Sequence, residues 1–314
     1  MCNPQLVLSA VPPGTDVFIS PYFVHRHPDY WSDAEKFIPD RFERLDEDGL
    51  SVDSLASPDH EAEARELAAG LDALVLDVKV GSGAFMGSLA EARALASALV
   101  EVANGAGCPT RALITDMNEP LASAAGNALE MVNAARFLTG EAIDGRLWDV
   151  TVALGAESLA RAGIAAGVED GADRMRMVFE SGAAAERFEA MVRALGGPAD
   201  FLDDYERHLV RAPVVAEVTA REPGFIRAID TKRLGFAVVE LGGGRRRASD
   251  RIDHSVGLDD LLGLGAAVEV GSPLARVHAA NPEALAAAEA RVRASYHIGD
   301  APLAEAPLIL DRIG

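Results

Sequence analysis

The sequence is poor in cysteine and in long apolar runs, and each shortage excludes a class of protein. Its two cysteines, Cys2 and Cys108, can form neither a disulfide framework nor a four-thiolate metal site. No stretch approaches the ~20 apolar residues of a membrane span. The only apolar run near the N-terminus, residues 6–11, is too short for a signal-peptide core. Together these shortages predict a cytoplasmic protein that does not enter a membrane.

Basic charge is also scarce, with 29 Lys and Arg against 49 Asp and Glu, which gives a net charge of −20. Nucleic acid is therefore not an expected partner, because its phosphates would face a largely acidic surface. A small anionic substrate is still allowed, since a local pocket can oppose the overall sign. Only three basic residues are lysines, and one of them, Lys79, lies beside a glycine-rich turn.

The residue pattern divides the 314 residues into four segments. Residues 1–45 are rich in aromatic residues and proline, and residues 46–61 form an acidic linker. Residues 62–212 alternate predicted strands and helices, which indicates a partial parallel sheet flanked by helices. Residues 213–314 contain short strand-like runs and a single helix, typical of an α+β domain. The fold class expected overall is α/β.

The individual elements follow from apolar periodicity and capping signals. A capping box at residues 88–91 opens one helix. The predicted strands are 73–80, 111–115, 214–218, 224–229, 236–241, 267–270 and 274–278, and the predicted helices are 88–104, 124–138, 150–165, 183–195 and 282–295.

The most informative stretch, residues 74–86, is a buried strand that ends in a Gly-Ser-Gly turn. Asp77 and Lys79 lie on the same strand face, and a buried ammonium group needs such an anionic partner. Glycines at the carboxyl end of a parallel strand let a ligand approach the backbone. The alternative is an ordinary strand–turn–helix corner. The pair is expected to support the turn rather than to catalyse.

Two other loops admit more than one interpretation. Asp116 and Asn118 follow the second strand at the same sheet edge, where they could bind a cation or cap the turn. The run of three glycines and three arginines at 242–247 favours a hairpin turn over an anion-binding nest.

Small residues around Gly126 predict close packing at a helix start. No zinc-ligand spacing, nucleophile elbow or Walker lysine loop is present.

Residues 67–86, 113–118, 126–130 and 236–253 together resemble the thymidine phosphorylases of the pyrimidine nucleoside phosphorylase family. The resemblance runs from about residue 62 to the C-terminus. It implies that thymidine and inorganic phosphate are converted to thymine and 2-deoxyribose 1-phosphate without an organic cofactor. It also implies dimerisation, through a helical domain that is mostly absent from this sequence.

The resemblance implies specific substrate contacts. Phe85 would touch the 5-position of the pyrimidine, beside the loop formed by Gly81, Ser82 and Gly83. Arg65 replaces a lysine that donates to a base carbonyl, and a guanidinium is not equivalent to an ammonium. Glu61 replaces a serine that contacts the base, and its charge would repel a departing pyrimidine anion.

The resemblance further implies a weak alkali-metal site. The backbone carbonyls of Leu121 and Ala124 would be ligands in some members of the family. The glutamate that completes that site is replaced here by Asn133, which brings no charge.

Two expected features of the N-terminal part are missing from the sequence. Residues about 6–44 resemble haem-thiolate monooxygenases of the cytochrome P-four-fifty family, but the haem-ligating cysteine loop does not follow, so no haem is expected. The phosphate-binding segments of the phosphorylases have no counterpart either. The chain alone is therefore expected to be inactive. The alternative is a non-catalytic remnant or interaction module.

Overall fold

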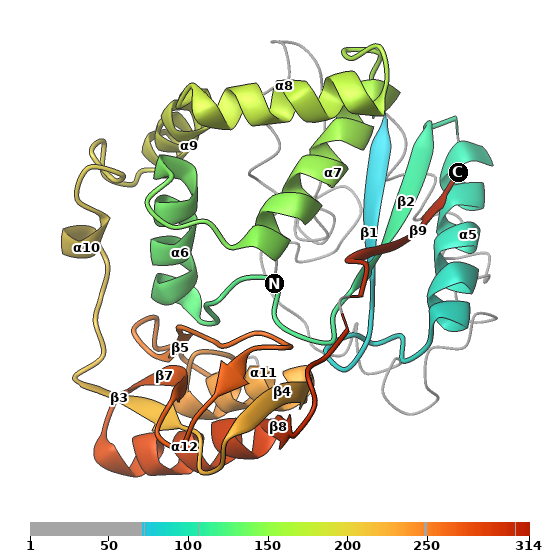
Figure 1. Ribbon diagram of the computed structural model, residues 1–314. Helices are drawn as coiled ribbons and strands as arrows, with labels where there is room; N and C mark the ends of the chain where they lie inside the picture. Colours follow the sequence, from blue (N-terminus) through green and yellow to red (C-terminus); the bar gives the residue numbers. More distant parts are fainter. Residues whose placement is uncertain (1–70, 72, 106, 248–249, 305) are drawn as a thin grey trace.

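The computed structural model describes residues 71, 73–105, 107–247, 250–304 and 306–314. Two lobes are visible in Figure 1: the upper one contains the first two strands and the last strand of the chain, and the lower one contains the other strands and the last two helices. This arrangement confirms the α/β fold class followed by an α+β unit. The segments predicted at 1–45 and 46–61 lie outside the described residues, and the boundary at 212/213 stays a prediction.

Two buried apolar segments form the parallel pair at the centre of the upper lobe. β1 (Leu74–Val80) pairs with β2 (Thr110–Asp116) in parallel, and α5 (Leu89–Gly105) connects them. One face of the pair packs against α5, and the other packs against α7 (Gly145–Arg161). Figure 1 shows these two helices on opposite sides of the strands. The parallel crossover predicted from the alternating pattern is confirmed.

A third strand from the end of the chain completes this sheet. β9 (Ile309–Ile313) pairs antiparallel with β2, so the order is β1-β2-β9. No strand was predicted at these residues. The pairing joins segments about two hundred positions apart, and the short run at 309–313 gives no local signal of its partner.

The remaining helices of the upper lobe share an apolar core with α7. They are α6 (Asn127–Thr139), α8 (Val168–Glu180), α9 (Ala183–Ala194) and the short α10 (Tyr205–His208). Phe137, Trp148 and Phe179 form an aromatic cluster, with ring centroids 5.0–6.0 Å apart. Helix α8 was not predicted, although its buried residues Gly171, Met175 and Phe179 lie at helical spacing and give a local signal, and the helix packs on α7.

The lower lobe contains two three-stranded sheets covered by two helices, α11 (Thr231–Leu241) and α12 (Pro282–Ser295). Its apolar core lies between these elements. In sheet order the strands are β3 (Val214–Thr219), β7 (Pro273–Ala279) and β5 (Gly257–Asp259), then β6 (Ala267–Val268), β4 (Gly224–Ile229) and β8 (Tyr296–Gly299).

The strand predicted at 236–241 is wrong, since these residues form the second half of α11. Asp230 caps the helix by accepting from the Arg233 amide, and Gly242 ends it in the left-handed conformation. The buried residues of this helix lie at helical spacing: Leu234, Ala237, Val238 and Leu241. This spacing is not apparent when only residues 236–241 are considered. The expected hairpin at 242–247 is therefore also wrong, because this loop follows a helix.

Candidate functional site

The glycine loop, residues 81–83, leaves the carboxyl end of β1 and lies against the carboxyl end of β2. We call this edge of the sheet the rim. The Gly83 amide donates to the Met117 carbonyl at 2.9 Å, and the Ser82 amide donates to Asn118 Oδ1 at 3.0 Å. The Met117 amide in turn donates to the Val80 carbonyl at 2.7 Å. The loop is thus held to the rim by hydrogen bonds on consecutive residues.

The side chain of Ser82 joins the glycine loop to the lower lobe. Its Oγ donates to the Ile229 carbonyl at 2.7 Å and lies 3.2 Å from Thr231 Oγ1. Ile229 ends β4 and Thr231 begins α11. The Ser82 hydroxyl is therefore engaged in a contact between the lobes, which gives it a positioning role beside the substrate contact expected from the resemblance.

The two glycines of the loop are needed for close packing. Gly81 has φ +131°, and a Cβ there would lie 2.8 Å from the Asn118 amide nitrogen. A Cβ on Gly83 would lie 2.7 Å from Cγ2 of Thr231. A larger residue at either position would push the loop away from the rim or from the lower lobe.

Asp77 and Lys79 form the ion pair that their spacing predicts, with Lys79 Nζ 2.7 Å from Asp77 Oδ2. Thr115 on the neighbouring strand joins them, since its Oγ1 accepts from Lys79 at 2.9 Å and donates to Asp77. Both charged side chains are mostly buried. The ammonium is therefore already neutralised within the sheet, which fits a supporting role.

Asp116 takes part in a second charged network at the rim. Arg146 on α7 lies 3.0 Å from Asp116 Oδ2 and 3.0 Å from Glu119 Oε1. Asn118 Nδ2 donates to the other oxygen of Asp116. Glu119 Oε2 accepts from the Leu264 amide at 2.6 Å, which links the network to the lower lobe. The Asp116 side chain thus binds an arginine and caps the turn.

Arg146 was not singled out from the sequence. It lies 30 positions from Asp116 on a different element, and only the packing of α7 against the sheet brings the two together.

The residues expected to contact the base are not brought together by the described part of the chain. Phe85 follows the glycine loop and is 91% exposed. Arg65 and Glu61 lie outside the described residues. Phe85 therefore has the exposure that a ligand contact requires, while the base-contact set as a whole stays a prediction.

Asn133 presents a donor rather than a ligand atom at the implied alkali-metal site. Asn133 directs its amide nitrogen, a donor, toward Asp144 Oδ2 at 2.7 Å. The same oxygen accepts from the amide and the hydroxyl of Ser123 at 3.0 and 3.1 Å. Leu121 lies two residues before this serine, and Ala124 follows it directly. In the described ranges, moreover, no group of three or more His, Cys, Asp or Glu side chains could hold a metal ion.

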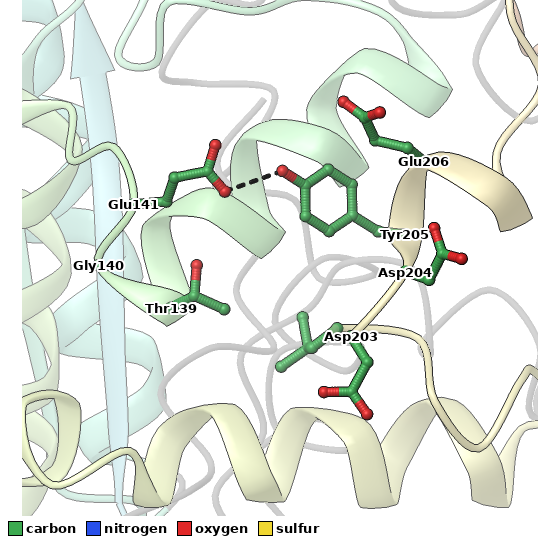
Figure 2. A pocket seen from close by; sticks show the side chains of 8 residues that line it. Thr139, Gly140, Glu141, Asp203, Asp204, Tyr205 and Glu206 are labelled. Carbon is green, nitrogen blue, oxygen red and sulfur yellow. Dashed lines mark hydrogen bonds between the residues drawn. The ribbon is translucent and has the colours of Figure 1, made fainter.

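A cavity of about 550 Å³ lies elsewhere, between the end of α6 and the segment before α10. Figure 2 shows carboxylates around it and the hydrogen bond from the Tyr205 hydroxyl to Glu141. The hydrogen bond with Tyr205 and two nearby carboxylates raise the pKa of Arg136. An anionic substrate is disfavoured there, because the lining is acidic: Thr139, Gly140, Glu141, Leu202, Asp203, Asp204, Tyr205 and Glu206.

A second cavity, of about 150 Å³, lies where the two lobes meet. Glu119, Ser123, Asp144 and Arg146 line it from the upper lobe, and residues 261–263 line it from the lower lobe. Tyr296 donates to the Leu262 carbonyl nearby, and burial raises the pKa of its hydroxyl.

Among the described residues, no helix has the length and apolar character needed to cross a membrane.

Comparison with known families divides the chain into three matching parts. Residues 62–185 match the a/b domain of the glycosyl transferase family. Residues 225–299 match the pyrimidine nucleoside phosphorylase C-terminal domain. Residues 9–57 match cytochrome P-four-fifty, and they lie outside the described part of the chain.

Curated relatives match the chain over most of its length. A thymidine phosphorylase from Sinorhizobium medicae is 51% identical over 250 residues, which cover 80% of this chain and 57% of the relative. One from Burkholderia lata is 50% identical over 264 residues, which cover 84% of this chain and 60% of the relative. One from Rhizobium meliloti is 52% identical over 250 residues. The chain thus spans less than two thirds of the length of these relatives.

Proposed function

We infer that residues from about 62 onward belong to the thymidine phosphorylase family, and from this premise we propose that they form the base-binding part of a pentosyltransferase acting on pyrimidine nucleosides. In this reaction the bond between sugar C1′ and the base nitrogen breaks, and a phosphate oxygen bonds to C1′. The base leaves with the bonding electron pair and then takes up a proton. Thymidine would give thymine and 2-deoxyribose 1-phosphate.

The observation that carries this proposal is the anchored glycine loop with Phe85 exposed beside it. Hydrogen bonds from Ser82 and Gly83 hold the loop to both lobes, so the ring of Phe85 starts from a rigid support. A supported aromatic ring next to glycine backbone suits a flat base, because stacking or edge contact costs little conformational entropy. Gly81, Ser82 and Gly83 would then shape the base side of the site, with Arg65 as a donor to a base carbonyl.

We further propose that the 314-residue chain by itself does not turn over substrate. The phosphate-binding segments expected of the family have no counterpart in its sequence. At the rim, Lys79 is paired with Asp77, and Arg146 is paired with Asp116 and Glu119. A phosphate dianion bound to either cation would have to displace a carboxylate.

The purified chain is expected to release no thymine from thymidine and phosphate above the rate without protein. Thymine release measured by chromatography tests this, with the full-length Sinorhizobium medicae thymidine phosphorylase as positive control. Robust turnover by the 314-residue chain would show that the proposed inactivity is wrong. Binding of carbon monoxide by a haem–thiolate centre is not expected in the same preparation.

Thymine is expected to bind the chain, and Phe85→Ala is expected to weaken binding about three- to tenfold, because it removes one aromatic contact. Isothermal titration calorimetry measures both affinities. Phe236→Ala is the matched control, since Phe236 is also an exposed phenylalanine, 60% accessible, on α11. Equal weakening by both variants, or no binding at all, would favour the alternative of a non-catalytic remnant or interaction module.

A further inference from the structure

We propose that Ser123, Asp144 and Asn133 form a hydrogen-bonded clasp that replaces an alkali-metal ion and makes this region independent of cations. The three residues come from three parts of the upper lobe. Ser123 lies in the loop before α6, Asn133 on α6, and Asp144 directly before α7. The clasp therefore ties a loop to two helices, as a bound cation with ligands from the same loop and helix would.

The geometry of the clasp centres on one oxygen. Asp144 Oδ2 accepts from Asn133 Nδ2 at 2.7 Å, from the Ser123 amide at 3.0 Å and from Ser123 Oγ at 3.1 Å. Although Asp144 precedes α7, its side chain makes no capping hydrogen bond to that helix. Its carboxylate is thus committed to the clasp. Hydrogen bonds to a charged acceptor are the stronger kind, so three of them hold the loop firmly.

Charge explains why asparagine rather than glutamate suits this arrangement. The clasp contains one carboxylate and three donors, so N–H and O–H groups stabilise the negative charge without a cation among them. A glutamate at 133 would place a second carboxylate at hydrogen-bonding distance from Asp144. Two such carboxylates repel each other, and a cation between them would relieve the repulsion. The residue at 133 therefore decides whether a cation is needed.

The position of the clasp makes its integrity matter to both lobes. The Ser123 carbonyl accepts from the Leu261 amide of the lower lobe at 3.0 Å. Two residues further on, Ala125 bridges to Leu258. Ser123, Asp144 and Leu261 also line the 150 Å³ cavity between the lobes. Loss of the clasp would free the loop that carries these contacts.

Thermal unfolding of the 314-residue protein in potassium, sodium and choline chloride at equal ionic strength tests the proposal. The midpoint of the unmodified protein is expected to agree within about 1 °C in the three salts. Asn133→Ala should lower it by about 3 °C or more in every salt, because a charge-assisted hydrogen bond is lost. Asn133→Glu should lower it most in choline and recover in potassium or sodium.

Ala190→Glu is the matched charge control, because Ala190 lies on the exposed surface of α9. Its midpoint should show no preference among the three salts. A potassium- or sodium-specific rise in the midpoint of the unmodified protein would overturn the proposal. So would an unchanged midpoint for Asn133→Ala, since a clasp whose removal costs nothing does not hold the loop. These outcomes do not depend on nucleoside binding or turnover, so they are independent of the proposed function.

Discussion

Gly126→Val is expected to lower the free energy of unfolding by about 3 kcal/mol or more, through backbone strain and steric overlap. Gly126 has φ +130°, a conformation that β-branched residues rarely adopt. A Cβ there would lie 2.7 Å from the Val256 carbonyl oxygen and 3.0 Å from the Gly257 Cα. Neither contact can be relieved by a side-chain rotation, because both neighbouring atoms belong to the backbone.

The effect is expected to be large because this contact joins the two lobes. Ala125 and Leu258 exchange two backbone hydrogen bonds of 2.8 Å, which form an isolated antiparallel bridge between the loop before α6 and strand β5. A Cβ on Gly257 would in turn overlap the Ala125 carbonyl oxygen. Glycine on both sides lets the two backbones approach. Valine at 126 would force them apart and weaken the bridge as well.

Urea unfolding followed by circular dichroism measures the loss, with Gly235→Ala as control. Gly235 lies inside α11, and a Cβ there meets no atom within 4 Å. Alanine at 235 should be neutral or stabilising by up to about 1 kcal/mol, because it restricts the unfolded chain and favours helix. If Gly126→Val were as stable as the unmodified protein, the close approach of the lobes would not require glycine.

Arg111→Met is expected to destabilise the protein by about 3 kcal/mol or more, because it removes the hydrogen-bonded ion-pair partner of a buried carboxylate and leaves only the longer contact with Arg312. Glu157 on α7 has a side chain only 1% exposed, and Arg111 Nη1 lies 3.0 Å from its Oε2. The other oxygen, Oε1, lies 3.3 Å from Arg312 Nε on β9 but has no hydrogen-bond partner among the described residues. Arg111 also donates to the Gly314 carbonyl, so its loss loosens the third strand.

A double-mutant cycle separates the charge effect from lost packing. Glu157→Met should cost less than Arg111→Met, because Arg111 keeps Gly314 and its side chain is 27% exposed. The double variant should recover much of the loss, since methionines suit a site next to apolar residues of α7. Arg176→Ala, which breaks an exposed pair with Asp173 on α8, should cost less than about 1 kcal/mol. Equal losses of unfolding free energy for Arg111→Met and Arg176→Ala would contradict this explanation.

The elements that were predicted correctly are those whose signals are local. Strands β1 and β2 contain short, mostly apolar runs, and the box at Ser88 and Glu91 closes as expected, with Glu91 Oε2 accepting from the Ser88 amide at 2.9 Å. The strand predicted at 236–241 failed because a short apolar run fits a strand and a buried helix face equally well. Strand β9 exists only through its pairing with β2.

The site divides in the same way. The pairing of Asp77 with Lys79 could be predicted, because side chains two residues apart on a strand lie on the same face. The hydrogen bond from Ser82 to Ile229 joins residues 147 positions apart, so no local sequence pattern could predict it. Glu61 and Arg65 lie outside the described residues, so the contacts expected of them stay predictions.

Local composition and periodicity were enough to predict the fold class and the glycine loop at the sheet edge, because these features depend on short-range backbone preferences, whereas the family was suggested by the resemblance of several short motifs. Tertiary structure alone decided what the loop residues contact. In the folded protein the Ser82 hydroxyl donates to the lower lobe, and Arg146 forms ion pairs with Asp116 and Glu119. The Asn133 side-chain amide donates to Asp144. These partners depend on how distant segments pack together, because a buried polar group needs a hydrogen-bond partner from whichever segment lies next to it.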